Sequence, residues 1–168
     1  MGERNSYMIA ILDNIRSMHN VGAVFRTSDG VGIEKIYLCG YTPAPVHETL
    51  GHIRPQVAKV ALGAEEWIAW EKHPTAWRLL DELKKQGYTI IALEQSKRSV
   101  PLGSVRLTKA QWEKSALVVG HELEGLSPAI LKRADIIAEI PMAGKKNSLN
   151  VSVAFGIASY TLAFNRKK

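Results

Sequence analysis

Short apolar runs alternate with helical segments along most of this chain, and this alternation constrains the fold more than any other feature of the sequence. Five runs rich in aliphatic and β-branched residues are expected to be strands: Tyr7–Leu12, Lys35–Cys39, Tyr88–Leu93, Ala116–Val119 and Asp135–Ile140. Apolar residues at helical spacing predict helices at Val21–Val31, Trp77–Lys85 and Asn150–Phe164. Such alternation predicts an α/β fold, in which a mostly parallel sheet is flanked by helices.

Two local signals refine the helical predictions. Gly32 is a plausible C-cap for the first helix, and Ser127-Pro128 is typical of a helix start, with a capping serine and a proline at the first position. The proline-rich stretch Tyr41–Pro55 is expected to be an irregular loop, and its length is typical of a functional loop.

The 168 residues suffice for one domain with a substantial core, so we expect a single domain spanning residues 1–168. No apolar run approaches the roughly 20 residues of a membrane-spanning helix, and no signal peptide is evident. Cys39, the single cysteine, lies in an apolar run where a buried, inert thiol is expected. These features predict a cytoplasmic protein without membrane contact.

The charge balance favours a polyanionic partner. The chain has 22 Lys and Arg against 16 Asp and Glu, a net charge of +6, which fits binding to nucleic acid. Several basic residues could contact phosphates: Arg16, His47, His52, Arg54, Lys145, Lys146, Arg166, Lys167 and Lys168. The five histidines show no metal-ligand spacing with one another or with Cys39, so no metal is predicted.

Ligands of open α/β sheets bind beyond the carboxyl ends of the strands, here around Asn14, Glu94, Gly120 and Pro141. Three polar segments follow such ends. In the first, Asn20 is expected to cap a helix and Arg26 lies within two turns of its anion-attracting start.

The second segment is the glycine-flanked loop Gly120–Ser127, in which Glu122 could pair with Arg26 or contact a substrate. The third is residues 140–154, where Ser148 or Asn150 could cap the last helix. Neither GxGxxG nor a phosphate-binding loop is present, which disfavours dinucleotides and nucleoside triphosphates. The residues alone predict ordinary strand-loop-helix connections.

Together these segments resemble the three sequence motifs of the SpoU family, the TrmH-like branch of the SPOUT methyltransferases. The matching stretches are Asn20–Thr27, Val119–Ser127, and Ile140–Met142 continued by Ser148–Ala154. Their order and spacing match, and the resemblance spans nearly the whole chain. It implies a C-terminal deep trefoil knot, with the knot and cofactor region at about residues 90–160, and a homodimer.

The resemblance also implies the chemistry. The cofactor would be S-adenosylmethionine, held by Leu93, Glu94, Val119, Gly120, Ile140, Met142, Ser148 and Leu149. The reaction would be methyl transfer to a ribose 2′-hydroxyl of tRNA or rRNA, with catalytic residues Arg26, Asn20, Glu122, Ser148 and Asn150. Because the pKa of an arginine is too high for a base, orientation and electrostatics are the favoured role for Arg26.

Two alternatives stay open. One is a non-catalytic RNA-binding SPOUT protein, for which loss of Asn20, Arg26 or Asn150 would be expected, although all three are present. The other is a base-nitrogen methyltransferase that uses Glu122 or Glu94 at its target. The sequence leaves open which RNA and nucleotide are modified, and whether the catalytic residues act within one subunit or across the dimer.

Overall fold

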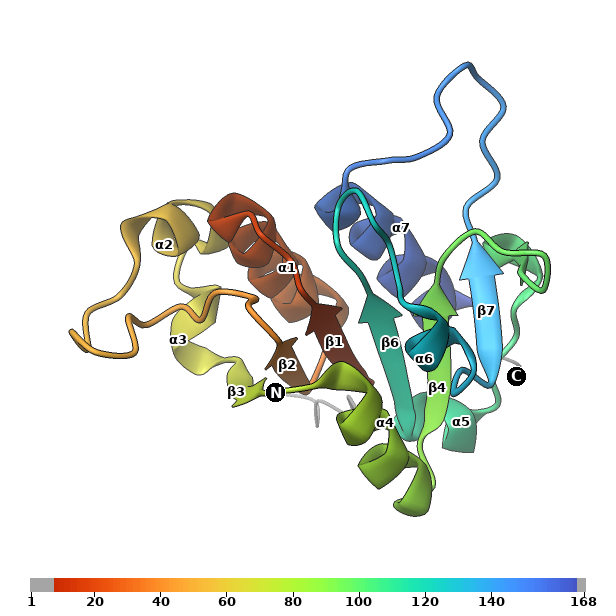
Figure 1. Cartoon of the computed structure of the whole chain (residues 1–168), viewed down its shortest axis with the longest axis horizontal. Helices are drawn as coiled ribbons and strands as arrows, with labels where there is room; N and C mark the ends of the chain where they lie inside the picture. The colour runs from red at the N-terminus through yellow and green to blue at the C-terminus, as the bar shows by residue number, and fades with distance from the viewer. Residues whose placement is uncertain (1–7, 166–168) are drawn as a thin grey trace.

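A parallel β-sheet forms the centre of the structure, a computed structural model that describes residues 8–165. Its strands are β1 (Ile9–Asp13), β2 (Lys35–Cys39), β3 (Ala69–His73), β4 (Thr89–Leu93), β5 (Val100–Pro101), β6 (Ser115–Val119) and β7 (Ile136–Glu139). They lie in the order β3-β2-β1-β6-β4-β7-β5, and every neighbouring pair in this sheet is parallel (Figure 1). The predicted α/β fold with a parallel sheet is confirmed.

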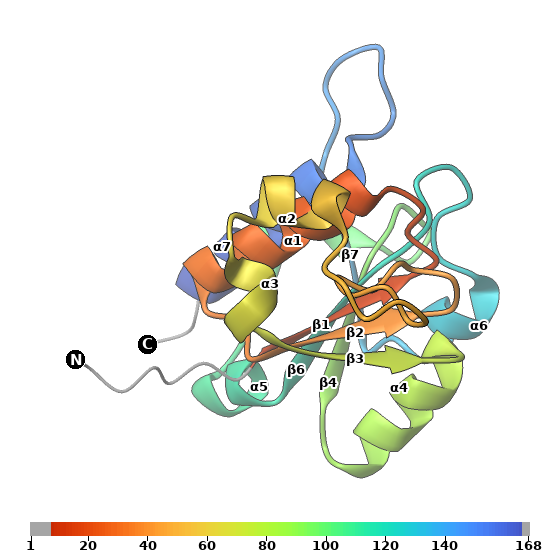
Figure 2. The same ribbon diagram turned by 90° about the vertical axis from the view of Figure 1, so that its left-hand side faces the viewer.

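Helices cover both faces of the sheet. They are α1 (Met18–Val31), α2 (Pro55–Ala61), α3 (Ala64–Trp67), α4 (Ala76–Lys85), α5 (Lys109–Glu113), α6 (Pro128–Leu131) and α7 (Val151–Phe164), with a 3₁₀ turn, η1, at Leu102–Ser104. The helices α1, α2 and α7 lie on one side of the sheet and α4 on the other (Figure 2).

Burial on both faces explains why the central strands are apolar throughout. In β1, Ala10 and Leu12 pack in one core cluster with Phe25 of α1 and Phe155 of α7. The intervening Ile9 and Ile11 belong to a second cluster with Leu80 and other residues of α4. Among the described residues, no helix is long and apolar enough to span a membrane.

The five predicted strands and the long predicted helices are all present, with ends that differ by a few residues. Tyr7, the first residue of the first predicted strand, lies outside the described residues. As predicted, Gly32 ends α1 in the left-handed conformation, with φ 83°, and Ser127 and Pro128 begin α6. The Ser127 side chain, however, forms no capping hydrogen bond. Strand β3 was missed because this edge strand is short, charged and only partly buried.

One helix cap differs from the prediction. Ser17, not Asn20, is the N-cap of α1, and its hydroxyl accepts a hydrogen bond from the Asn20 amide at 3.2 Å. Asn20 therefore lies inside the first turn, where its side chain is available to partners outside the helix.

The strand order places the carboxyl ends of β1, β6, β4 and β7 side by side, as the sequence predicts. The connection from β7 to α7 extends beyond this edge of the sheet (Figure 1).

Candidate active site

A hollow of about 440 Å³ lies at the carboxyl edge of the sheet. It is lined by the ends of β4, β6 and β7, by the loops that follow them and by the first turn of α7. All eight predicted cofactor residues line it: Leu93, Glu94, Val119, Gly120, Ile140, Met142, Ser148 and Leu149. Its volume is within the usual range of small-molecule sites.

The lining of this hollow is acidic although the chain is basic. It holds the carboxylates of Glu94, Glu122, Glu124 and Glu139, and no lysine or arginine of the described residues is among its lining residues. Aliphatic side chains and Met142 line the rest. Such a site favours a ligand that combines positive charge with an apolar portion and disfavours phosphates. This charge pattern fits S-adenosylmethionine, whose sulfonium and ammonium groups outweigh its one carboxylate and which also carries an adenine.

Glu94 organises the loop that follows β6. Its carboxylate accepts hydrogen bonds from the backbone amides of Leu126, at 2.8 Å, and Gln95, at 2.9 Å. A side chain at Gly125 would collide with this carboxylate, and Gly125 also has φ 67°. A Cβ on Gly120 would lie 2.7 Å from the Gly125 carbonyl. The two glycines thus let the loop close on itself.

Three predicted catalytic residues meet in one hydrogen-bond network. The Asn20 side-chain amide donates to Oε1 of Glu122 at 3.1 Å, and the Asn20 oxygen accepts from Nδ2 of Asn150 at 3.2 Å. Asn150 also caps α7, since its oxygen accepts a hydrogen bond from the Ser152 amide at 2.9 Å. The network joins the three segments that follow β1, β6 and β7.

Glu122 is held as a carboxylate. It accepts hydrogen bonds from the backbone amides of Arg16 and Ser17, each at 3.2 Å, as well as from Asn20. Partial burial favours the neutral acid, but these hydrogen bonds and one from its own amide outweigh it and lower the pKa of Glu122 below 4.5.

Arg26 and Ser148 lie outside this network. Arg26 is exposed on α1, and its side chain forms no hydrogen bond or ion pair with any residue that the structure describes. An ion pair with Glu122, one option that the sequence left open, is therefore not formed. Ser148 is exposed on the β7–α7 connection at the edge of the hollow.

Three lining residues lie outside the stretches that match the family motifs and were not predicted as site residues: Gln95, Glu139 and Asn147. The Gln95 side-chain amide donates to the Asn147 carbonyl and so ties the loop after β4 to the β7–α7 connection. Glu139 accepts a hydrogen bond from the Ser99 hydroxyl at 2.9 Å. The available signals were the predicted strand ends, where Gln95 and Glu139 lie, and the predicted cofactor residue Ser148, which follows Asn147.

Comparison with known proteins identifies relatives over nearly the full chain. The model of the SpoU rRNA Methylase family matches residues 7–160. The tRNA (guanosine(18)-2′-O)-methyltransferase of Aquifex aeolicus is 36% identical over 99% of this chain and 73% of its own length. The 23S rRNA (guanosine-2′-O-)-methyltransferase RlmB of Coxiella burnetii is 32% identical over 95% of this chain and 59% of its own.

A solved structure shares the fold. The AdoMet-bound rRNA methyltransferase of Sinorhizobium meliloti superposes with a TM-score of 0.76, at 25% identity, over 92% of this chain and 55% of its own.

Proposed function

Because this chain belongs to the SpoU rRNA methylase family, we propose that it transfers a methyl group from S-adenosylmethionine to a ribose 2′-hydroxyl of tRNA or rRNA. The observation that carries this proposal is the assembly of Asn20, Glu122 and Asn150 beside an acidic, partly apolar hollow. A tRNA is the first candidate substrate, because the relative with 36% identity is named as a tRNA methyltransferase.

The hydrogen bonds of the Glu122 and Glu94 carboxylates support a ribose hydroxyl, and not a base nitrogen, as the group that is methylated. Glu122 already accepts hydrogen bonds from two backbone amides and Asn20. Glu94 accepts them from the amides of Gln95 and Leu126. Methylation of a base nitrogen calls for a carboxylate that can take a proton, and the two carboxylates that the sequence offered for this role are committed to organising the site.

We assign cofactor binding to the eight predicted residues that line the hollow. The apolar side chains would surround the adenine, and the carboxylates would favour the positive charge. When bound, S-adenosylmethionine supplies an electrophilic methyl group. Asn20, Glu122 and Asn150 fix the first turns of α1 and α7, between which the ribose would be held, and Ser148 would contact the ligand from the edge of the hollow. Positioning of this kind supplies much of the rate in such transfers.

We propose that the protein is a homodimer. Four apolar side chains, between 40% and 78% exposed, form a stripe along α7: Val153, Ile157, Tyr160 and Phe164. They share one helical face, and the rings of Tyr160 and Phe164 stack at 5.9 Å. An exposed apolar stripe on a helix is typical of a subunit interface.

The position of Arg26 supports a role across that interface. A Cβ on Gly30 would lie 2.7 Å from the Tyr160 hydroxyl, so Tyr160 of the stripe covers α1 one turn from Arg26. Arg26 does not line the hollow of its own chain. We therefore assign it to the active site of the partner subunit, where it would orient the ribose and its phosphate.

We further propose that residues 1–168 form a single domain and that the protein acts in the cytoplasm. We also propose that about residues 90–160 form a deep trefoil knot. Contacts between the end of α7 and the segment after β5 support the knot. The Asn165 side-chain amide donates to the carbonyls of Gly103 and Val105, both at 3.2 Å. The last helix thus lies against a loop that precedes it by some 60 residues.

A labelling experiment tests the function. The protein is incubated with methyl-labelled S-adenosylmethionine and bulk RNA from a strain that lacks its gene, and the RNA is digested to nucleosides. We expect the label in a 2′-O-methylated nucleoside of the tRNA or rRNA fraction. Label in a base would overturn the ribose assignment, and no binding of S-adenosylmethionine would overturn the enzymatic one.

A further inference from the structure

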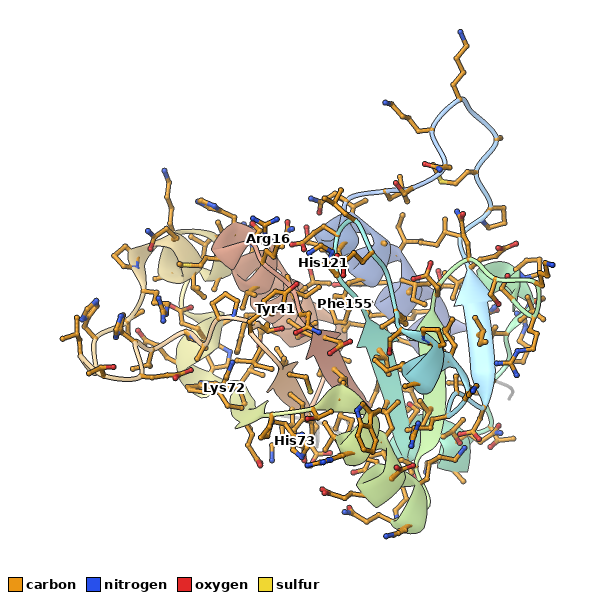
Figure 3. The ribbon with its side chains drawn as sticks, in the orientation of Figure 1. Arg16, Tyr41, Lys72, His73, His121 and Phe155 are labelled. Carbon is orange, nitrogen blue, oxygen red and sulfur yellow. The ribbon has the colours of Figure 1, made fainter. Side chains whose placement is uncertain are left out.

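A second hollow, of about 600 Å³, adjoins the first at the carboxyl edge of the sheet. It shares His121, Leu123 and Glu124 with the first hollow, to which we assign the cofactor (the cofactor hollow). Its other lining residues are Arg16, Met18, Tyr41 and Pro43. Figure 3 shows Arg16, Tyr41 and His121 close together near the carboxyl ends of β1 and β6. This second hollow is more open and contains an aromatic side chain and a cation.

The backbone around Tyr41 is held in place. The Tyr41 amide donates to the Asn14 side-chain oxygen at 3.2 Å. The Lys72 ammonium donates to the carbonyls of the two flanking residues, to Gly40 at 3.0 Å and to Thr42 at 2.6 Å. Thr42 is fully buried, and its hydroxyl donates to the Leu12 carbonyl at 3.0 Å. The Tyr41 ring therefore projects from a fixed anchor.

Two residues in the left-handed backbone region contribute to this anchor. Asn14 has φ 58° and Gly40 has φ 59°, both in the left-handed region. A side chain at Gly40 would collide with the Asn14 side-chain oxygen, which accepts the hydrogen bond from the Tyr41 amide. Left-handed non-glycine residues are uncommon and are enriched at functional sites.

The Tyr41 side chain is nevertheless 57% exposed. Its ring meets the His121 ring nearly at a right angle, at 83°, with centroids 6.2 Å apart, and the two rings form an open corner. Leu123, at 86% exposed, lines the same hollow. A rigidly anchored aromatic ring with so much exposed surface is suited to stack against a flat ligand.

Arg16 supplies a positive charge beside this corner. Its side chain is exposed and forms no hydrogen bond or ion pair with any residue of the described range 8–165. Its backbone amide, in contrast, is fixed by Glu122 at 3.2 Å. A guanidinium placed in this way can bind a phosphate next to a stacked base.

We propose that the second hollow is a nucleobase subsite, in which a base of the substrate RNA stacks on Tyr41 while Arg16 binds a neighbouring phosphate. This inference rests on the proposed function. His121, Leu123 and Glu124 border both hollows, so the ribose of a base bound in the second hollow would face the cofactor in the first. Stacking on a tyrosine accepts any base, so the subsite positions the nucleotide without selecting it.

The test combines RNA binding with turnover. Wild type, Tyr41→Ala, Tyr41→Phe and Tyr41→Trp are compared for retention of bulk RNA from the gene-deletion strain in the presence of S-adenosylhomocysteine, and for KM and kcat with that RNA. Loss of one base–aromatic stack corresponds to about a 5- to 150-fold weakening. We expect such a loss for Tyr41→Ala and near wild-type binding for Tyr41→Phe and Tyr41→Trp.

Trp67→Ala is the matched control, since Trp67 is 58% exposed and lines neither hollow. We expect it to bind RNA normally, and S-adenosylmethionine to bind all variants equally. Wild-type RNA binding by Tyr41→Ala would overturn the subsite. Equal loss in Tyr41→Phe would also overturn it, because the hydroxyl would then be the group that matters. If wild type binds RNA through Tyr41 but transfers no methyl group, the proposed function fails and the subsite stands.

Discussion

The Asn20 side-chain amide donates a 3.1 Å hydrogen bond to Glu122, a residue 102 positions away along the chain. The same Asn20 side chain accepts from Asn150, 130 positions away. One short side chain thus holds together the loop after β6 and the starts of two helices. This connection gives the site its shape before any ligand arrives.

Replacement of Asn20 should lower the catalytic activity strongly and the stability of the fold only moderately. Asn20→Ala removes the acceptor of the Asn150 side-chain NH2 group and one of the two hydrogen bonds to Oε1 of Glu122, which keeps the bond from the Ser17 amide. We expect a cost of about 1–2 kcal/mol in the free energy of unfolding. We expect kcat/KM for RNA to fall at least about 10-fold, since small misplacements of reacting groups are costly.

Asn165→Ala is the control for Asn20, because Asn165 also bonds distant carbonyls but lies away from the hollow. It should lose comparable stability in urea denaturation and keep its activity. Equal activity losses in the two variants would contradict a specific role for Asn20.

The carboxylate of Glu122 should make the stability of the fold depend on acid pH. Its hydrogen bonds lower its pKa in the folded state below 4.5, so its stabilisation is present above that value and is lost as the pH falls through the folded pKa. Glu122→Gln should be less stable than wild type by about 1 kcal/mol at pH 7, after allowance for solvent exposure.

Urea denaturation of both proteins at pH 7 and near pH 3.5 measures this difference. We expect the gap between wild type and Glu122→Gln to narrow at the lower pH. A gap that is independent of pH would show that the charge of Glu122 contributes nothing to stability.

Arg26 should act on the partner's site. Arg26→Ala should lower kcat by about 10-fold or more and leave S-adenosylmethionine binding unchanged, because Arg26 does not line the cofactor hollow. A heterodimer of Arg26→Ala with Asn20→Ala, purified through two different tags, distinguishes the two arrangements. If Arg26 acts on the partner's site, one of the two sites in this heterodimer has both Asn20 and Arg26, and about half of the wild-type activity is expected. Action within one chain leaves both sites impaired, and activity that stays low would refute the assignment.

The apolar stripe of α7 should control the oligomeric state. Ile157→Glu places a charge in the middle of the stripe, and we expect a monomer by size-exclusion chromatography with light scattering. Leu50→Glu, at a loop residue that is 67% exposed, should leave the dimer intact. A dimer that persists in Ile157→Glu would assign the interface to another surface.

Cys39 should resist alkylation in the folded protein. It is fully buried, and burial raises the pKa of its thiol to about 12. Since the thiolate is the reactive species, iodoacetamide at pH 8 should modify the protein only after denaturation. Mass spectrometry of the intact protein before and after addition of urea measures this. Rapid labelling of the native protein would show that β2 opens readily.

Local patterns in the sequence determined the elements of the fold. The apolar runs of β1, β4 and β6 and the helical spacing of α1, α4 and α7 follow from burial on one or two faces, which is a property of neighbouring residues. The family motifs also pointed to the segments that line the hollow of about 440 Å³. Their matching order along the chain was sufficient to predict the reaction class.

Tertiary structure decided which side chains meet. Ser17 rather than Asn20 caps α1, and Asn20 instead contacts Glu122 and Asn150. Tyr41 gains its fixed position from Lys72 of β3, a strand whose charged sequence gave no signal. Such contacts depend on the order of strands in the sheet and on the geometry of individual loops. Neither property is encoded by periodicity, because residues separated by tens of positions leave no shared pattern in a single sequence.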